Sequence, residues 1–162
     1  MNVGQLMTRN IEACHPGDAL NAAARIMWEH DCGCVPVVVD EEGGARVVGM
    51  LTDRDICMAA YTQGCPLGAI DVASAMSRDV RSCRPTDPVR VAVSILRTNQ
   101  LHRLPVLDPN DHLIGLLSLA DIAREAGREH GRRNAEVKDQ QIAETVEAIC
   151  QPRSPREIMH AA

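Results

Sequence analysis

The stretch Gly49-Met50-Leu51-Thr52-Asp53-Arg54-Asp55 decides the fold, because the chain contains it twice. It returns in altered form as Gly115-Leu116-Leu117-Ser118-Leu119-Ala120-Asp121. Both versions end an apolar, strand-like run with a glycine, a hydroxyl residue and, three positions later, an aspartate. Because an internal repeat defines the architecture of a chain, we expect two related halves of roughly 60 residues, with any ligand site between them.

The repeat holds its register outside this stretch. Met7 matches Met76 and Pro36 matches Pro105, both at a separation of 69 (76 − 7 and 105 − 36). The two glycines that open the motif are separated by 66 (115 − 49), so the first half contains three more residues (69 − 66). The polar segment 41–44 is where we place them, since such residues favour turns.

Composition and charge limit the classes of function. The chain has 162 residues, of which 45% are hydrophobic, with one Trp, one Tyr and no Phe, so the core is expected to be aliphatic. The net charge of −5 and the scattered basic residues argue against a nucleic-acid partner. No apolar run of about 18 residues is present, which argues against a membrane span. We expect a soluble, cytoplasmic protein.

Hydrophobic periodicity predicts an α+β fold in which each half is a β-α-β-β-α repeat. In the first half we expect an extended segment at 10–14, a helix from about 16 to 30 with Asp18 as its N-cap, a hairpin of 34–39 with 46–51, and a helix from Thr52 to about 62. The corresponding segments of the second half are 80–83, 88–100, 103–107 with 112–117, and a helix from Ser118.

The predicted domain boundaries follow from these elements. We expect repeat 1 at 1–62, a linker at 63–71, repeat 2 at 72–126 and a C-terminal tail at 127–162. The tail contains an amphipathic helix at about 137–150, with Ile142, Val146, Ile149 and Cys150 on one face. We expect that face to pack on the module or on a second subunit.

The doubled motif has a chemical interpretation and a structural one. A helix N-terminus attracts phosphate, and a threonine or serine hydroxyl can add a hydrogen bond. An aspartate in the first turn can accept bonds from the two hydroxyls of a ribose, and the earlier glycine removes a side chain where a nucleoside would lie. The alternative is a capping box, in which hydroxyl and carboxylate satisfy the backbone of the helix start. The spacing is compatible with both.

The chain resembles a cystathionine-β-synthase (CBS) domain pair, also called a Bateman module. The resemblance rests on 6–8, 35–37 and 49–55 in the first half and on 75–77, 104–106 and 115–121 in the second. It implies two repeats packed with pseudo-twofold symmetry and two clefts that hold adenosine-containing ligands. In that family the hydroxyl residue contacts phosphate or ribose, and the aspartate holds the ribose.

Carried over to this sequence, the resemblance assigns Thr52 and Asp55 to one cleft and Ser118 and Asp121 to the other. The pair His102-Arg103 resembles the basic residues that reach phosphates in nucleotide-sensing repeats. The first half has Gly33 and Cys34 at those positions, which leaves Arg54 as the nearby cation of the Asp55 cleft. We therefore expect the phosphorylated ligand in the Asp121 cleft. Ile11 and Val80 are the expected apolar neighbours of the adenine.

The function that the resemblance implies is regulatory and non-catalytic. The expected ligand is AMP or ATP, with NAD and S-adenosylmethionine as alternatives, and no metal is expected. The expected partners are a second copy, giving a homodimer, and an unidentified protein that receives the signal, with no nucleic acid and no membrane. The alternative is a stress module that responds to redox state or zinc through its seven cysteines.

The cysteines support two further hypotheses. Cys14 and the segment 148–152 resemble free-standing bacterial CBS pairs of the hypoxic-response type, which suggests a disulfide between Cys14 and Cys150. A zinc site at Cys32, Cys34 and His30 is less favoured because a fourth ligand is not evident. Cys57, in the middle of a predicted helix, is expected to fill core space.

Overall fold

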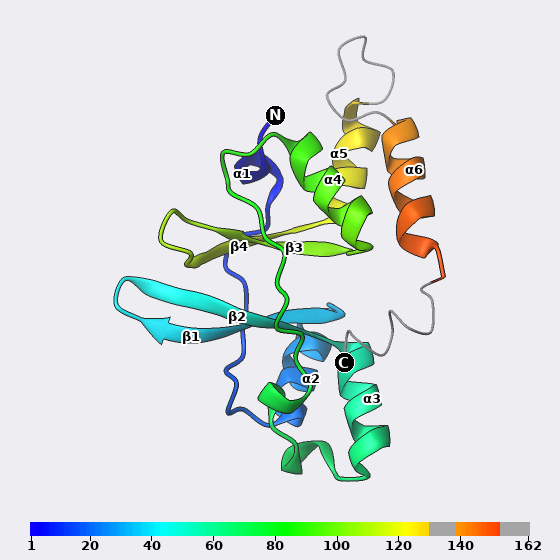
Figure 1. The fold of residues 1–162 in the computed structure, drawn as a ribbon. Coiled ribbons are helices and arrows are strands. Elements are labelled where there is room, and N and C mark those ends of the chain that lie inside the picture. The colour runs from blue at the N-terminus through cyan, green and yellow to red at the C-terminus, as the bar shows by residue number, and fades with distance from the viewer. Residues whose placement is uncertain (130–138, 153–162) are drawn as a thin grey trace. The chain divides into compact units, whose positions relative to one another are not determined.

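The computed structural model describes residues 1–129 and 139–152 and contains two compact units. One unit comprises 12–80 and 111–113, and we call it the Asp55 unit. The other comprises the described residues of 1–11, 81–110, 114–129 and 139–152, and we call it the Asp121 unit. Each unit has one antiparallel pair of strands with helices, as Figure 1 shows, which confirms the predicted mixture of helix and strand.

The Asp55 unit is built on the hairpin of β1 (Cys34–Glu41) and β2 (Gly44–Thr52). Helix α2 (Leu20–Glu29) precedes the hairpin and α3 (Asp53–Gln63) follows it. Two short 3-10 turns, η1 (Leu67–Ala69) and η2 (Val72–Ser74), come next. Gly43 has a φ of 92°, a left-handed conformation that glycine adopts without strain, so the hairpin turns there.

The Asp121 unit repeats this plan with a shorter hairpin, β3 (Arg103–Leu107) and β4 (Leu113–Ser118). Helix α4 (Val89–Asn99) precedes it, and α5 (Leu119–Glu129) follows. Helices α1 (Val3–Leu6) and α6 (Asp139–Cys150) also belong to this unit. The additional residues of the first half therefore lie in the hairpin, as predicted, where they lengthen the strands rather than the turn.

Segments distant in sequence flank each hairpin. In the Asp55 unit, Cys14 forms a parallel bridge with Val37, and Ser77 forms an antiparallel bridge with Met50. In the Asp121 unit, Cys83 pairs with Val106 in the same way and Thr8 pairs with Leu116. The predicted first strands are thus reduced to single bridges. The N-terminal residues 1–11 belong to the unit of the second repeat, while residues 72–80 belong to the unit of the first.

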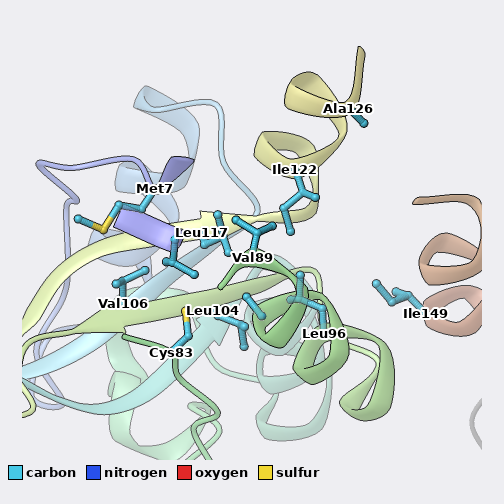
Figure 2. Close-up of a cluster of buried hydrophobic side chains, with 12 residues drawn as sticks. Met7, Cys83, Val89, Leu96, Leu104, Val106, Leu117, Ile122, Ala126 and Ile149 are labelled. Carbon is cyan, nitrogen blue, oxygen red and sulfur yellow. The ribbon is translucent and has the colours of Figure 1, made fainter. Parts of the chain in front are cut away.

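Each unit has its own aliphatic core. The core of the Asp121 unit draws on the hairpin, α4, α5, α6 and the N-terminal segment (Figure 2), with members that include Met7, Val89, Leu96, Leu104, Leu117, Ile122 and Ile149. The equivalent core of the Asp55 unit includes Leu20, Met27, Val35, Leu51, Ile56, Ile70 and Met76. On α2 and α4 the buried positions recur at helical spacing, at Leu20, Ala23 and Met27 and at Val89, Ala92 and Leu96.

Helix α6 packs on α4 and α5, as Figure 1 shows. Its buried face is formed by Thr145 and Ile149, with Ile142 partly buried, whereas Val146 and Cys150 are exposed. The predicted apolar face was correct for Ile142 and Ile149 and wrong for Val146 and Cys150. Thr145, rather than Val146, faces the core. At the end of α6, the Gln100 side-chain amide donates to the carbonyls of Ala148 and Gln151 at 3.1 Å each.

Three predicted helix details differ in the structure. Asp18 is not an N-cap: α2 begins later, after Ala19, and the Asp18 carboxylate accepts a hydrogen bond from the His15 backbone N–H at 2.7 Å. Cys57 is exposed on α3 and fills no core space. Helix α5 continues to Glu129, beyond the predicted boundary at 126. The remaining tail residues at 130–138 and 153–162 lie outside the described part of the chain.

Candidate functional site

The first candidate site is the junction of β2 and α3, where Thr52 and Asp55 form a reciprocal cap. Oδ2 of Asp55 accepts from the Thr52 backbone N–H at 2.8 Å and from the Thr52 hydroxyl at 2.7 Å. The Asp55 backbone N–H donates to the Thr52 hydroxyl oxygen at 3.2 Å. This is the capping box that the sequence offered as its alternative. It occupies only one of the two oxygens of the carboxylate.

The second candidate site repeats this cap at the junction of β4 and α5. Oδ2 of Asp121 accepts from the Ser118 backbone N–H at 2.8 Å and from the Ser118 hydroxyl at 2.5 Å. Here Oδ1 is engaged as well, because the guanidinium of Arg124 forms an ion pair with it. Asp121 is only 8% exposed, whereas the side chain of Arg124 is 64% exposed. Sequence reasoning missed Arg124, although its spacing of i+3 from the aspartate is a recognisable helical pair.

The backbone donors at the two helix starts are mostly satisfied within the chain. Leu119 donates to the carbonyl of His102 at 2.9 Å, and Asp53 donates to the carbonyl of Gly33 at 3.1 Å. The Arg54 N–H donates to the Asp53 carboxylate at 2.7 Å, so an acidic side chain already lies at the start of α3. Leu119 stands at the position of Asp53 in the second repeat, so α5 has no such carboxylate. The two helix starts therefore differ in how well they can receive an anion.

The motif glycines have a role other than the predicted one. A Cβ atom on Gly49 would lie 2.7 Å from Sδ of Met76 and 3.0 Å from the carbonyl oxygen of Ser77. A Cβ atom on Gly115 would lie 2.8 Å from both Sδ of Met7 and the carbonyl oxygen of Thr8. The space that the missing side chains leave is filled by the chain itself. The glycines therefore do not clear this space for a nucleoside, and the place of the nucleoside stays a prediction.

The crossing segments place the predicted apolar residues in the same units as the motifs to which they were assigned. Residues 72–80 join the Asp55 unit, so Val80 belongs with Thr52 and Asp55. Ile11 belongs with Ser118 and Asp121 in the other unit. Both side chains are partly buried. Each motif is therefore accompanied by the short segment from the opposite half of the sequence.

The predicted basic residues lie beside the second motif. His102 is held at the start of α5 by the bond from the Leu119 N–H to its carbonyl, and Arg103 follows as the first residue of β3. His102 is exposed and Arg103 is partly buried. With Arg124, three basic residues belong to the unit that contains Ser118 and Asp121. In the Asp55 unit, Arg54 is exposed and is accompanied by Asp53.

The cysteines divide into buried and exposed thiols. Burial is the main cause that raises the pKa of Cys14 to about 11 and that of Cys83 to about 12, with smaller contributions from Asp18 and Asp87 respectively. Cys57, Cys65 and Cys150 are exposed. Cys14 and Cys150 are both free thiols in the structure, and they belong to different units. Across the described residues, no group of three or more His, Cys, Asp and Glu side chains is arranged to hold a metal ion.

Helices α2 and α3 expose large apolar side chains. Trp28 on α2 is 88% exposed, and Met58 and Tyr61 on α3 are 47% and 81% exposed. Trp28 also borders a hollow of about 430 Å³ between the end of α2 and the start of α3, with Asp31 and Asp53 at its rim. The equivalent helices of the other unit, α4 and α5, are covered by α6. No helix among the described residues is long and apolar enough to span a membrane.

Two repeated units, each with a hydroxyl–aspartate cap at the junction between its hairpin and the following helix, define a fold built from a pair of related domains. The sequence model of the CBS domain matches residues 3–61 and 70–128, so the chain belongs to the CBS domain family. This confirms the resemblance seen in the sequence. A CBS domain-containing protein of Bacillus subtilis, YhcV, is 34% identical over 122 residues, covering 75% of this chain and 83% of that protein.

Solved structures of CBS proteins have the same fold. The crystal structure of Hypoxic Response Protein I with two coordinated zinc ions is 27% identical, with a TM-score of 0.68, and the match covers 76% of this chain and 98% of that one. A CBS domain pair in complex with 5′-methylthioadenosine and S-adenosyl-L-methionine is 23% identical, with a TM-score of 0.69. That match covers 80% of this chain and 98% of the other, and it shows a likeness of fold.

Proposed function

We propose that the chain is a non-catalytic regulatory module that binds adenosine-containing ligands at its two hydroxyl–aspartate junctions and passes the signal to a partner protein. The observation that carries this proposal is the doubled cap within a CBS domain pair. Each cap holds a carboxylate rigidly at a strand–helix junction while using only Oδ2 for the helix. The other oxygen is the group that a ribose would use.

The rigid cap suits ribose binding for a physical reason. A carboxylate that is already fixed loses little conformational entropy when it accepts a bond from a ligand hydroxyl. At Asp55, no donor among the described residues bonds to Oδ1, so that oxygen is available. A CBS pair of the same fold has been crystallised with 5′-methylthioadenosine and S-adenosyl-L-methionine, and we infer the same chemical class of ligand for this chain.

The two sites are expected to prefer different ligands. The Asp121 unit contributes His102, Arg103 and Arg124, and α5 begins with Leu119 at the position where α3 has Asp53. Charge-assisted bonds to phosphate favour AMP or ATP there. In the Asp55 unit, the Asp53 carboxylate occupies the start of α3. That site is better suited to an adenosyl ligand without phosphate.

We further propose that the chain forms a homodimer through α2 and α3 of the Asp55 unit. Monomeric proteins rarely expose large apolar side chains in groups, and this surface exposes the only Trp and the only Tyr of the chain. The same region exposes both signs of charge, since Arg25, Asp31, Asp53 and Arg54 are all exposed. A twofold axis would set the basic residues of one copy against the acidic residues of the other.

The ligand proposal is tested by isothermal titration of the wild-type chain with AMP, ATP, NAD, S-adenosylmethionine and 5′-methylthioadenosine. Asp55→Asn and Asp121→Asn remove the charge of one site each while leaving an amide oxygen that can still cap the helix. We expect each substitution to abolish one class of binding and to spare the other. Absence of binding by every compound, with the fold intact by circular dichroism, would overturn the proposal.

The dimer proposal is tested by sedimentation equilibrium. Trp28→Ser with Tyr61→Ser should convert the dimer to a monomer, because it removes the two large apolar side chains that α2 and α3 expose most. Val146→Ser, which removes an exposed apolar side chain from α6, is the control and should leave the dimer intact. A wild-type monomer at high micromolar concentration, or a dimer unaffected by the double substitution, would contradict the proposal.

A second candidate function is binding of zinc, because a structure 27% identical to this chain contains two coordinated zinc ions. Since the described residues of one chain contain no ready group of ligands, zinc would have to be shared with a second copy or with residues outside the described part. Metal analysis of the purified dimer tests this directly. Stoichiometric zinc that survives dialysis would support zinc binding. Absence of zinc would contradict it and leave adenosyl binding as the single proposed function.

A further inference from the structure

The two aspartates differ in the state of their second oxygen. At Asp121, the Arg124 guanidinium already occupies Oδ1, while Oδ2 is committed to the cap. At Asp55, Oδ2 caps the helix in the same way and no described residue bonds to Oδ1. A ribose can therefore approach Asp55 directly. At Asp121 it has to displace or share the arginine.

The difference arises from one position of the repeat. Arg124 follows Asp121 by three residues, and the residue three after Asp55 is Met58. Each is the sixth residue of its helix and lies on the second turn of the equivalent helices α5 and α3. Methionine has no charge and cannot engage a carboxylate. Arg124 therefore competes with the ribose for Asp121, and the Asp55 site has no equivalent competitor.

Displacing Arg124 has a consequence that depends on the ligand. Asp121 is buried and Arg124 is largely exposed, so the guanidinium can swing away while the carboxylate stays in place. If the ligand carries a phosphate, the released guanidinium gains a new anionic partner, and an arginine fork fits phosphate oxygens well. A neutral nucleoside offers no such partner, and a cationic one repels the arginine.

We propose that Arg124 is a specificity-determining residue that makes the Asp121 site selective for phosphorylated adenosyl ligands. It exchanges its ion pair with Asp121 for one with the ligand phosphate as the ribose binds. Met58 leaves the equivalent site open to adenosyl ligands without phosphate. This inference rests on the proposed function of the two sites and assigns their different ligand classes to one pair of residues.

The test compares AMP with 5′-methylthioadenosine in a chain whose Asp55 site is silenced by Asp55→Asn. In this background we expect AMP to bind more tightly than methylthioadenosine. Arg124→Met should weaken AMP about tenfold or more, the loss expected for a charge-assisted bond, and should tighten methylthioadenosine several-fold. The control is Arg128→Met, which removes an exposed arginine that pairs with Glu125 one turn further along α5 and should change neither affinity.

The reciprocal substitution completes the test. In a chain with Asp121→Asn, Met58→Arg should weaken methylthioadenosine at the Asp55 site and strengthen AMP. Equal loss of both ligands in Arg124→Met, or an unchanged preference, would overturn the role of Arg124 while leaving adenosyl binding established. If the wild-type chain binds neither compound, the proposed function itself fails and the inference fails with it.

Discussion

Sδ of Met76 lies 2.7 Å from the point that a Cβ atom on Gly49 would occupy, and Met7 stands in the same relation to Gly115 at 2.8 Å. The glycines of the motif are therefore required by the packing of a crossing segment against its hairpin. Gly115→Ala should destabilise the chain by about 1–3 kcal/mol, the usual effect of overpacking. Urea denaturation followed by circular dichroism measures this loss.

The neighbours of the two glycines allow a sharper comparison. The backbone oxygen of Thr8 lies 2.8 Å from the added carbon at Gly115, whereas that of Ser77 lies 3.0 Å from the added carbon at Gly49. A thioether can move aside more easily than a bridged backbone. Gly115→Ala should thus lower the denaturation midpoint more than Gly49→Ala. An equal or reversed order would show that the methionines, not the backbone oxygens, limit the space.

The capping hydroxyls should contribute to stability in the absence of any ligand. Thr52→Ala and Ser118→Ala each remove the acceptor for an N–H in the first turn and a donor to the aspartate, and should cost about 0.5–2 kcal/mol. Thr62→Ala is a matched control, because that exposed hydroxyl only bonds back to the carbonyls of its own helix. Thermal melts of the three variants check the order. Unchanged melting temperatures for Thr52→Ala and Ser118→Ala would contradict a stabilising role of the capping hydroxyls.

Helix α6 should stabilise the Asp121 unit through one side chain above all. Ile149 is buried against the core, so Ile149→Ala should lose about 2–5 kcal/mol. Val146 was predicted on the same face but is 41% exposed, and Val146→Ala should change stability by about 0.5 kcal/mol or less. Equal effects of the two substitutions in urea denaturation would mean that the helix packs in another rotation.

The buried thiols make stability depend on alkaline pH. The folded pKa values of Cys14 and Cys83, about 11 and about 12, lie above the value of 9.0 for a free thiol. The unfolded chain therefore loses these protons first, so stability is fully present below pH 9 and declines as pH rises from 9 toward 11 and 12. Denaturation midpoints at pH 8, 9 and 10 in reductant should show this decline. It should be smaller in the Cys14→Ala, Cys83→Ala variant, and an identical decline would refute this origin.

Alkylation of the native chain tests both the burial of the thiols and the disulfide hypothesis. Cys57, Cys65 and Cys150 should react rapidly, while Cys14, Cys34 and Cys83 should resist because they are buried. Peptide mapping of protein purified without reductant provides the second readout. A linked Cys14–Cys150 peptide would support the predicted disulfide, and rapid labelling of Cys150 in that sample would exclude it.

The sequence predicted the hairpins and the closing helices well, because both leave strong local signals. The β-branched runs predicted the strands. The spacing of Thr52 and Asp55, which is that of a capping box, predicted the start of α3. Asp18 shows where such local reasoning fails. Its carboxylate satisfies the N–H of His15 instead of the helix, and a turn of this kind has the same residue types as a cap.

The site was less predictable because its contacts are not local. The spacing of glycine, hydroxyl and aspartate was visible, yet nothing near Gly49 in sequence indicates that Met76 occupies the adjoining space. The ion pair of Arg124 with Asp121 is a different case, since its i+3 spacing was readable in the sequence. The ion pair was missed because comparison of the two repeats identifies only the residues that they share. The first repeat has Met58 at the position of Arg124.

The crossing of residues 1–11 and 72–80 between units makes the two halves of the gene product mutually dependent. A chain divided within 63–71 would yield an N-terminal fragment that lacks the strand partner of Met50 and a C-terminal fragment that lacks the strand partner of Leu116. Each fragment would hold the piece that the other needs. Two fragments cut at the linker are therefore expected to complement each other. Their reassembly would restore the pairing of Ser77 with Met50 and of Thr8 with Leu116.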